Sequence, residues 1–150
     1  AEMLSWLFWQ IGSAPFIGGG FGHFYAYAPE KYEYPINRYA METKRLFSVA
    51  DQRLGETRFL AGDEYTIADI AAFPWLAPFV EGIIYNDATT FLSIHEYENV
   101  ARWVDEIASR PAVRRGRIVN KTWGDEASQL RERHSAADFE GKVLEPSKPV

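Results

Sequence analysis

Three carboxylates crowd the stretch AGDEYTIADI, residues 61–70, where Asp63, Glu64 and Asp69 fall within seven positions. Carboxylates at this density could bind a metal ion or take part in proton transfer. Thr66 and Asp69, however, have the S/T-x-x-D/E spacing of a capping box, in which each side chain satisfies a backbone N–H of the other residue. A metal site would also need ligands that converge from elsewhere in the chain. We therefore interpret Thr66 and Asp69 as structural capping residues that start a helix.

Histidine and cysteine, the other residues that favour metal binding and nucleophilic chemistry, form no pattern. His23, His95 and His134 have no paired spacing with one another or with the acids. There is no cysteine, which excludes disulfides, thiolate nucleophiles and cysteine metal ligands. The sequence therefore predicts no metal site, and any thiol chemistry needs a thiol from another molecule.

A glycine-rich run, GGGFGHF at residues 18–24, is superficially like a phosphate-binding loop. It lacks the G-x-G-x-x-G spacing, a preceding strand and a following lysine, so nucleotide binding is not expected. The aromatic residues in and after the run could form the wall of a binding pocket, or they could pack beneath a loop.

Two polar positions and one basic cluster have ordinary structural interpretations. Arg38 precedes Glu42 by four residues, which is typical of an exposed helical ion pair. Gln10 reads as a solvent-facing residue of a helix. The basic cluster RRGR at 114–117 is more typical of a solvated face or an intramolecular ion-pair site than of a nucleic-acid groove, although it could line an entrance for an anion.

The composition indicates one well-folded domain with a large core. The 150 residues are 47% apolar and include five Trp, eight Tyr and ten Phe. A net charge of -5 disfavours nucleic acid as a partner. No apolar stretch approaches the roughly 18 to 20 residues that span a bilayer, and the start has no features of a signal peptide. We expect a soluble, cytoplasmic protein with no membrane partner.

Apolar spacing near 3.6 residues predicts a chain of helices. The first covers about 3–11 and is followed by a loop at 12–29. The second runs to Leu54, with Pro35 either kinking it or starting it, and Gly55 ends it. A third starts near Thr66 and should be bent or stopped by Pro74 and Pro78. Further helices are expected at 97–108 and 111–119, and FVEGIIY at 79–85 is a weak strand candidate.

The predicted fold is all-α, a bundle of about five or six helices with an extended C-terminal tail. We expect residues 1–121 to form the helical domain. Residues 122–150 should be an extension that packs on it and then becomes flexible, because polar residues dominate there and the last segment, EGKVLEPSKPV, is typical of a tail.

Several stretches together resemble a known family. FLAGDEYTIADI, the helix with Pro and Trp that follows it, Trp103 and RPAVRRG at 110–116 look like the C-terminal helical domain of a cytosolic glutathione transferase. LSWLFWQIG, the stretch from GGGFGHFYAYAPEKY to NRYAMETKRL, and GRIVNKT resemble the bacterial nu class, the disulfide-bond reductase type. The resemblance covers nearly the whole chain.

This resemblance implies a larger protein in which a thioredoxin-like domain precedes the present chain and holds the catalytic residue. The whole protein would be a homodimer that uses glutathione as co-substrate to reduce small disulfides, with possible weak conjugation or peroxidase activity. Arg38 matches the arginine that nu-class proteins use to contact glutathione, and Gln10 is the nearest match to their glutamine in the first helix. The resemblance assigns Phe21, His23, Phe24 and Tyr27 to the wall of the second-substrate pocket.

Two further expectations follow. The chain alone should be inactive and should expose Trp6 and Trp9 where the preceding domain belongs. The alternative function is a noncatalytic interaction module of the same fold, because helical domains of this kind serve that purpose in some translation proteins.

Overall fold

The computed structural model describes residues 1–130, 132–140 and 142. Within these residues the regular elements are helices, six of them α-helices, besides an isolated antiparallel bridge between Phe59 and Gly62. The all-α prediction is therefore confirmed, and the described residues place no strand at 79–85. None of their helices is both long and apolar enough to cross a bilayer.

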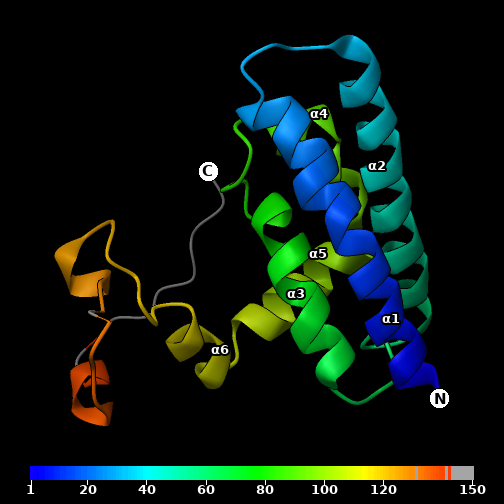
Figure 1. Cartoon of the computed structure of the whole chain (residues 1–150). Coiled ribbons are helices and arrows are strands. Elements are labelled where there is room, and N and C mark those ends of the chain that lie inside the picture. The colour runs from blue at the N-terminus through cyan, green and yellow to red at the C-terminus, as the bar shows by residue number, and fades with distance from the viewer. Residues whose placement is uncertain (131, 141, 143–150) are drawn as a thin grey trace. The chain divides into compact units, whose positions relative to one another are not determined.

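The chain divides into two compact units, a first that contains Ala1–Val104 and a second, Asp105–Lys148. Such units are defined by contacts and need not fold independently, so the domain boundary after residue 121 stays a prediction. In the first unit, α1 (Glu2–Pro15) continues into a π-helix, η1 (Phe16–Tyr27), and α2 (Glu33–Glu56) returns antiparallel beside them (Figure 1). α3 (Ile67–Val80) packs against α1.

Short elements complete both units. α4 (Ala88–Phe91) and a 3-10 helix, η2 (Ile94–Glu96), lead to α5 (Glu98–Ala108), which crosses the boundary between the units. The second unit contains α6 (Pro111–Gly116) and two 3-10 helices, η3 (Glu126–Ser128) and η4 (Ala136–Phe139). Most of the final segment predicted to be a flexible tail lies outside the described residues.

The predicted loop at 12–29 is largely helical, so this prediction was wrong. α1 runs into η1 without a break, and Pro15 adopts helical angles of φ -61 and ψ -32. The glycines of η1 make room for two tyrosine rings: a Cβ on Gly20 would lie 2.4 Å from the Tyr39 ring, and one on Gly22 would lie 2.3 Å from the Tyr85 ring. Tertiary packing therefore determines this segment against the local preference of glycine for turns.

The prolines are also better tolerated than expected. α3 continues through Pro74 and Pro78 to Val80, so neither residue stops the helix. Pro35 lies in the first turn of α2, where a missing N–H costs no intrahelical hydrogen bond. α3 is held instead by the core, which buries its apolar residues Ala68, Ala72, Phe73, Leu76, Ala77 and Phe79.

A carboxylate of α2 caps the start of α5. Asp51 Oδ1 accepts hydrogen bonds from the backbone N–H groups of Asn99, at 2.9 Å, and Val100, at 3.1 Å. These are first-turn donors that have no partner within their own helix. The contact therefore fixes α5 against α2 through a polar interaction as well as through the buried apolar core.

Candidate functional site

The acidic stretch divides into surface and core residues. Asp63 and Glu64 are exposed, whereas Asp69 is fully buried. Thr66 is the N-cap of α3 and forms a capping box with Asp69, whose Oδ2 accepts from Thr66 N–H at 3.0 Å. The described residues contain no group of His, Asp or Glu able to hold a metal ion. The geometry gives Thr66 and Asp69 a structural role.

Arg38 is an exposed cation with a weak partner. Its guanidinium lies 3.8 Å from the Glu42 carboxylate, and 52% of its side chain is exposed. Glu42 pairs mainly with Arg45, at 2.6 Å, and this hydrogen bond lowers the pKa of Glu42 although burial opposes the shift. Arg38 therefore keeps donors that can receive a carboxylate from a ligand.

Gln10 is buried rather than solvent-facing, with 8% of the residue exposed. It lines a cavity of about 10 Å³ between α1 and α3. Arg38, in contrast, is an exposed residue of α2. The two residues assigned to glutathione therefore lie on different helices, and one is buried while the other is exposed. No local pattern in the sequence distinguishes a buried glutamine from an exposed one on such an apolar helix.

The four aromatic residues proposed as a pocket wall belong to two clusters. His23 and Phe24 pack edge to face at 5.0 Å, and Phe24 stacks on Tyr39 of α2 at 5.6 Å. Tyr27 is 71% exposed and packs edge to face on Tyr85 at 5.7 Å.

Phe21 has no exposed surface and packs against the rings of Tyr25, Phe79, Tyr85 and Phe91. This burial does not favour the assignment of Phe21 to a pocket wall, which stays a prediction. The alternative of packing beneath the segment is the arrangement found for this residue.

A polar contact near the second cluster was missed in the sequence. Tyr25 donates a hydrogen bond of 2.5 Å to Asp87 Oδ1, and burial followed by this hydrogen bond and the charge of Asp87 raises the pKa of Tyr25 to about 12. Tyr25 and Asp87 are far apart in the chain, so no spacing rule could have found this hydrogen bond. Two residues before Asp87, Tyr85 adopts a left-handed φ of 55, which is unusual for a bulky residue.

An exposed apolar surface covers parts of α1 and α3. We name it the α1–α3 apolar surface, and it consists of Leu4, Phe8, Ile11, Ile67, Ile70 and Trp75. α1 and α3 pack side by side (Figure 1). A surface of this kind is typical of a protein interface.

The predicted exposure of Trp6 and Trp9 is only partial. Their rings pack edge to face at 5.3 Å and both residues are only partly exposed. The guanidinium of Arg53, from the end of α2, lies 5.8 Å from the Trp6 ring. Other apolar residues of α1 are more exposed, with Phe8 at 67%.

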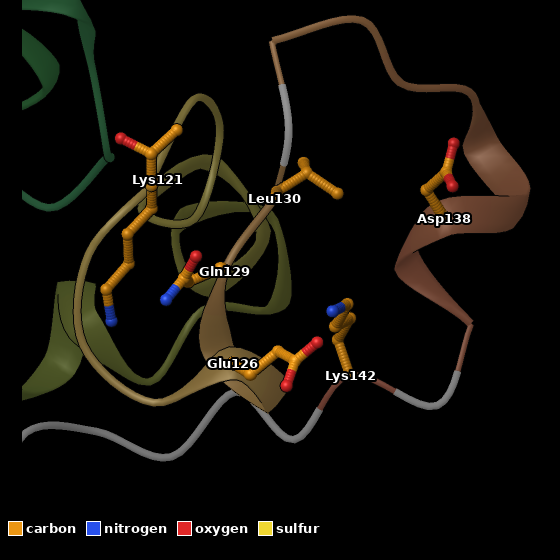
Figure 2. A pocket seen from close by; sticks show the side chains of 7 residues that line it. Lys121, Glu126, Gln129, Leu130, Asp138 and Lys142 are labelled. Carbon is orange, nitrogen blue, oxygen red and sulfur yellow. The ribbon is translucent and has the colours of Figure 1, made fainter.

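The second unit contains a pocket of about 310 Å³ (Figure 2). Its walls are held by a hydrogen bond of 2.8 Å from Leu130 N–H to the Lys121 carbonyl and by one of 3.1 Å from Lys121 Nζ to Ser128 Oγ. The pocket contains both positively and negatively charged side chains, so it has no clear preference for an anion. The lining residues are Lys121, Thr122, Glu126, Gln129, Leu130, Asp138 and Lys142.

Comparison with known proteins agrees with the architecture. A family model described as "Glutathione S-transferase, C-terminal domain" matches residues 6–111. The disulfide-bond oxidoreductase YghU of Escherichia coli is 58% identical over 139 residues, which are 93% of this chain and 48% of that protein. The disulfide-bond oxidoreductase YfcG of Escherichia coli is 37% identical over 85% of this chain and 55% of its own length.

Solved structures of glutathione transferases also match the fold of this chain. Glutathione transferase YghU from Streptococcus pneumoniae, complexed with glutathione, has a TM-score of 0.75 and 53% sequence identity over 77% of this chain and 44% of that one. The chain thus spans about half the length of the relatives that it matches. The match to more than half of its residues and the shared helical architecture place the chain in the glutathione S-transferase family, as a C-terminal domain.

Proposed function

We propose that this chain is the helical half of a nu-class-like glutathione transferase whose whole form is a glutathione-dependent disulfide-bond reductase. Weak conjugation or peroxidase activity of the whole protein belongs to the same proposal. The relatives YghU and YfcG are named disulfide-bond oxidoreductases, and the Streptococcus pneumoniae structure contains glutathione. The observation in this chain that carries the proposal is the exposed Arg38, whose neighbour Glu42 is already held by Arg45.

Glutathione has two carboxylates, and a guanidinium can hold one of them through two parallel hydrogen bonds. Arg38 would therefore position glutathione, while His23, Phe24 and Tyr27 would border the second substrate. The contact of Gln10 with glutathione stays a prediction, and its burial against α3 does not favour it. This chain has no cysteine and supplies no thiol itself. In the proposed reaction glutathione provides the attacking thiol.

The proposed reaction is a thiol–disulfide exchange. A glutathione thiolate attacks one sulfur of the substrate disulfide, the other sulfur leaves as a thiolate, and a mixed disulfide forms. A second glutathione then attacks the glutathione sulfur of that mixed disulfide, releasing the second substrate thiol and glutathione disulfide. The preceding domain would supply the group that activates the thiol, and this chain would supply binding and orientation.

The proposal includes a thioredoxin-like domain of the same protein, seated on the α1–α3 apolar surface, and a cytoplasmic homodimer. The exposure of Leu4, Phe8 and Ile11 on α1 and of Ile67 and Ile70 on α3 supports the domain contact, since clustered apolar residues are normally covered. The same surface also fits the second candidate, a noncatalytic interaction module, because either function requires a protein partner there.

An activity assay separates the two candidates. Glutathione-dependent reduction of a small disulfide should be absent in the 150-residue chain and present in a protein that also contains the preceding domain. Activity of the chain alone would contradict the proposed division of labour. No activity in the longer protein, or a gene that encodes no such domain, would favour the noncatalytic module.

A further inference from the structure

Two successive residues in the connection between α3 and α4 adopt left-handed backbone angles, and neither is glycine. The φ values are 55 for Tyr85 and 59 for Asn86. Asparagine is tolerated in this region because its short polar side chain can hydrogen-bond locally, but a bulky tyrosine is a genuine outlier there. Such outliers persist only where the surrounding structure holds them, and they cluster at functional sites. The contacts of Tyr85 therefore indicate what the strained residue does.

The phenol ring of Tyr85 is seated on η1 at Gly22. A Cβ on Gly22 would lie 2.3 Å from Cζ of Tyr85 and 2.6 Å from its hydroxyl oxygen, so the ring occupies the space that a side chain there would need. The ring also packs edge to face against Phe79 of α3, at 5.5 Å, and Phe21 of η1, at 6.3 Å. The Tyr85 side chain is thus fixed by two elements, η1 and α3.

A hydrogen bond holds the same connection to η1. Tyr25, near the end of η1, donates to Asp87 Oδ1 at 2.5 Å, and Asp87 directly follows the two left-handed residues. Tyr25 also stacks on Phe21, at 4.8 Å. Residues 85–87 are therefore attached to the C-terminal half of η1 at two points, Gly22 and Tyr25.

Tyr27, the last residue of η1, lies beside this attachment. It is 71% exposed, and its ring meets the Tyr85 ring edge to face, at 5.7 Å and 87°. An exposed tyrosine has several rotamers available, and a fixed aromatic ring beside it favours one of them. Because Tyr85 is itself held by η1 and α3, it keeps the Tyr27 ring in a defined position.

We propose that Tyr85 is a positioning residue that acts through Tyr27: its left-handed backbone directs its ring onto the Tyr27 ring, which is then held in place for the second substrate. This inference rests on the proposed function, in which Tyr27 borders the disulfide substrate. A ring that is ordered before binding loses less conformational entropy when the disulfide binds. Tyr85 therefore lowers the KM for the disulfide and takes no part in holding glutathione, which is the proposed role of Arg38.

Steady-state kinetics of the longer protein that includes the preceding domain test this role, with glutathione and bis(hydroxyethyl) disulfide as substrates. Tyr85→Asn removes the ring but keeps a residue that tolerates the left-handed backbone. Its KM for the disulfide should rise about two- to tenfold, the value of one aromatic pair, while kcat and the KM for glutathione stay unchanged. Tyr85→Phe keeps the ring and should retain the original KM for the disulfide.

A second substitution separates action through Tyr27 from an independent effect of Tyr85. Tyr27→Ala should itself raise the KM for the disulfide. Adding Tyr85→Asn should then raise it no further, because a residue that acts through another has no effect once the other is removed. Additive effects of the two substitutions would contradict the proposal, and so would an unchanged KM for the disulfide in Tyr85→Asn.

Thermal unfolding shows which variants fold. If Tyr85→Asn does not fold, Tyr85→His replaces it, because histidine also tolerates left-handed angles and its smaller ring reaches less far towards Tyr27. The KM for the disulfide should rise in this variant too, and an unchanged value would overturn the proposal. No disulfide reduction by the unaltered longer protein would instead overturn the proposed function, and this inference with it.

Discussion

The indole nitrogen of Trp103 on α5 donates a hydrogen bond of 2.9 Å to the carboxylate of Asp69 on α3. The same carboxylate accepts from the backbone N–H groups of Leu60, at 2.9 Å, and Thr66, at 3.0 Å. Asp69 and Trp103 have no exposed surface. One buried side chain thus joins the start of α3, the turn before it and the middle of the core.

Replacing Asp69 should be among the most damaging changes in the chain. Asp69→Ala leaves three N–H donors without their acceptor. Because buried unpaired groups are costly, we expect the free energy of unfolding to fall by about 3 kcal/mol or more. Urea unfolding followed by circular dichroism measures the change. The exposed Asp63→Ala is the control and should change stability by less than about 0.5 kcal/mol. Equal effects of the two substitutions would contradict the structural role of Asp69.

Replacing two threonines by valine should have different effects on the stability of the fold. Thr43 is fully buried on α2 and its hydroxyl has no partner in the described residues, so Thr43→Val should leave stability unchanged or raise it by up to about 1 kcal/mol. Thr66 caps α3, and Thr66→Val should cost about 1 kcal/mol. Thermal unfolding of both variants checks the pair. A clear loss of stability in Thr43→Val would show that its hydroxyl is hydrogen-bonded.

The glycines of the α1–η1 segment should differ in their tolerance of alanine. Gly20→Ala and Gly22→Ala push a methyl group into the rings of Tyr39 and Tyr85, and we expect each to cost about 1 to 3 kcal/mol. Gly12, within α1, has nothing within 4 Å of an added Cβ. Gly12→Ala should therefore stabilise the chain by about 0.5 to 1 kcal/mol through helix propensity. Similar melting temperatures for all three variants would argue against the packing of these rings on η1.

The contact between Tyr25 and Asp87 should make stability depend on alkaline pH. Burial, the hydrogen bond and the charge of Asp87 raise the pKa of Tyr25 from 10.0 to about 12. The folded protein then keeps a proton that the unfolded chain has lost, so this stabilisation is complete below pH 10 and decreases as the pH rises through about 12.

Urea unfolding at a series of alkaline pH values measures this dependence. Tyr25→Phe should flatten the decrease, and Asp87→Asn should move the tyrosine titration, followed by absorbance, towards ordinary values. Identical titration curves for the wild-type chain and Asp87→Asn would contradict the contact.

Local rules predicted much of the scaffold. The capping box of Thr66 and Asp69 was recognisable because it depends on residues three positions apart. The apolar stripe of α2 was equally clear, and the residues expected on it, such as Leu46, Phe47, Ala50 and Leu54, are buried. Both features depend on the chain within one or two helical turns.

Features that depend on distant residues were not predictable in the same way. Taken by themselves, the glycines of η1 indicate a loop. Their role becomes clear only from the packing of the Tyr39 and Tyr85 rings against them, and both residues are distant in the sequence. Arg53, from the far end of α2, lies over the Trp6 ring, a contact that no local pattern in α1 predicts. Gln10 could be placed on a helix but not on its buried side, since that side is determined by the packing of α3.

The affinity of Arg38 variants for glutathione tests the central claim most directly. The measurement is a calorimetric titration of the longer protein that includes the preceding domain, with Arg133→Ala, an exposed arginine of the second unit, as the control. Loss of a charge-assisted contact is typically worth about 1.5 to 3 kcal/mol, so Arg38→Ala should weaken glutathione binding by roughly tenfold or more. Arg133→Ala should bind glutathione as the unchanged protein does. An unaltered affinity in Arg38→Ala would contradict the account and leave Arg38 with only its surface ion pair to Glu42.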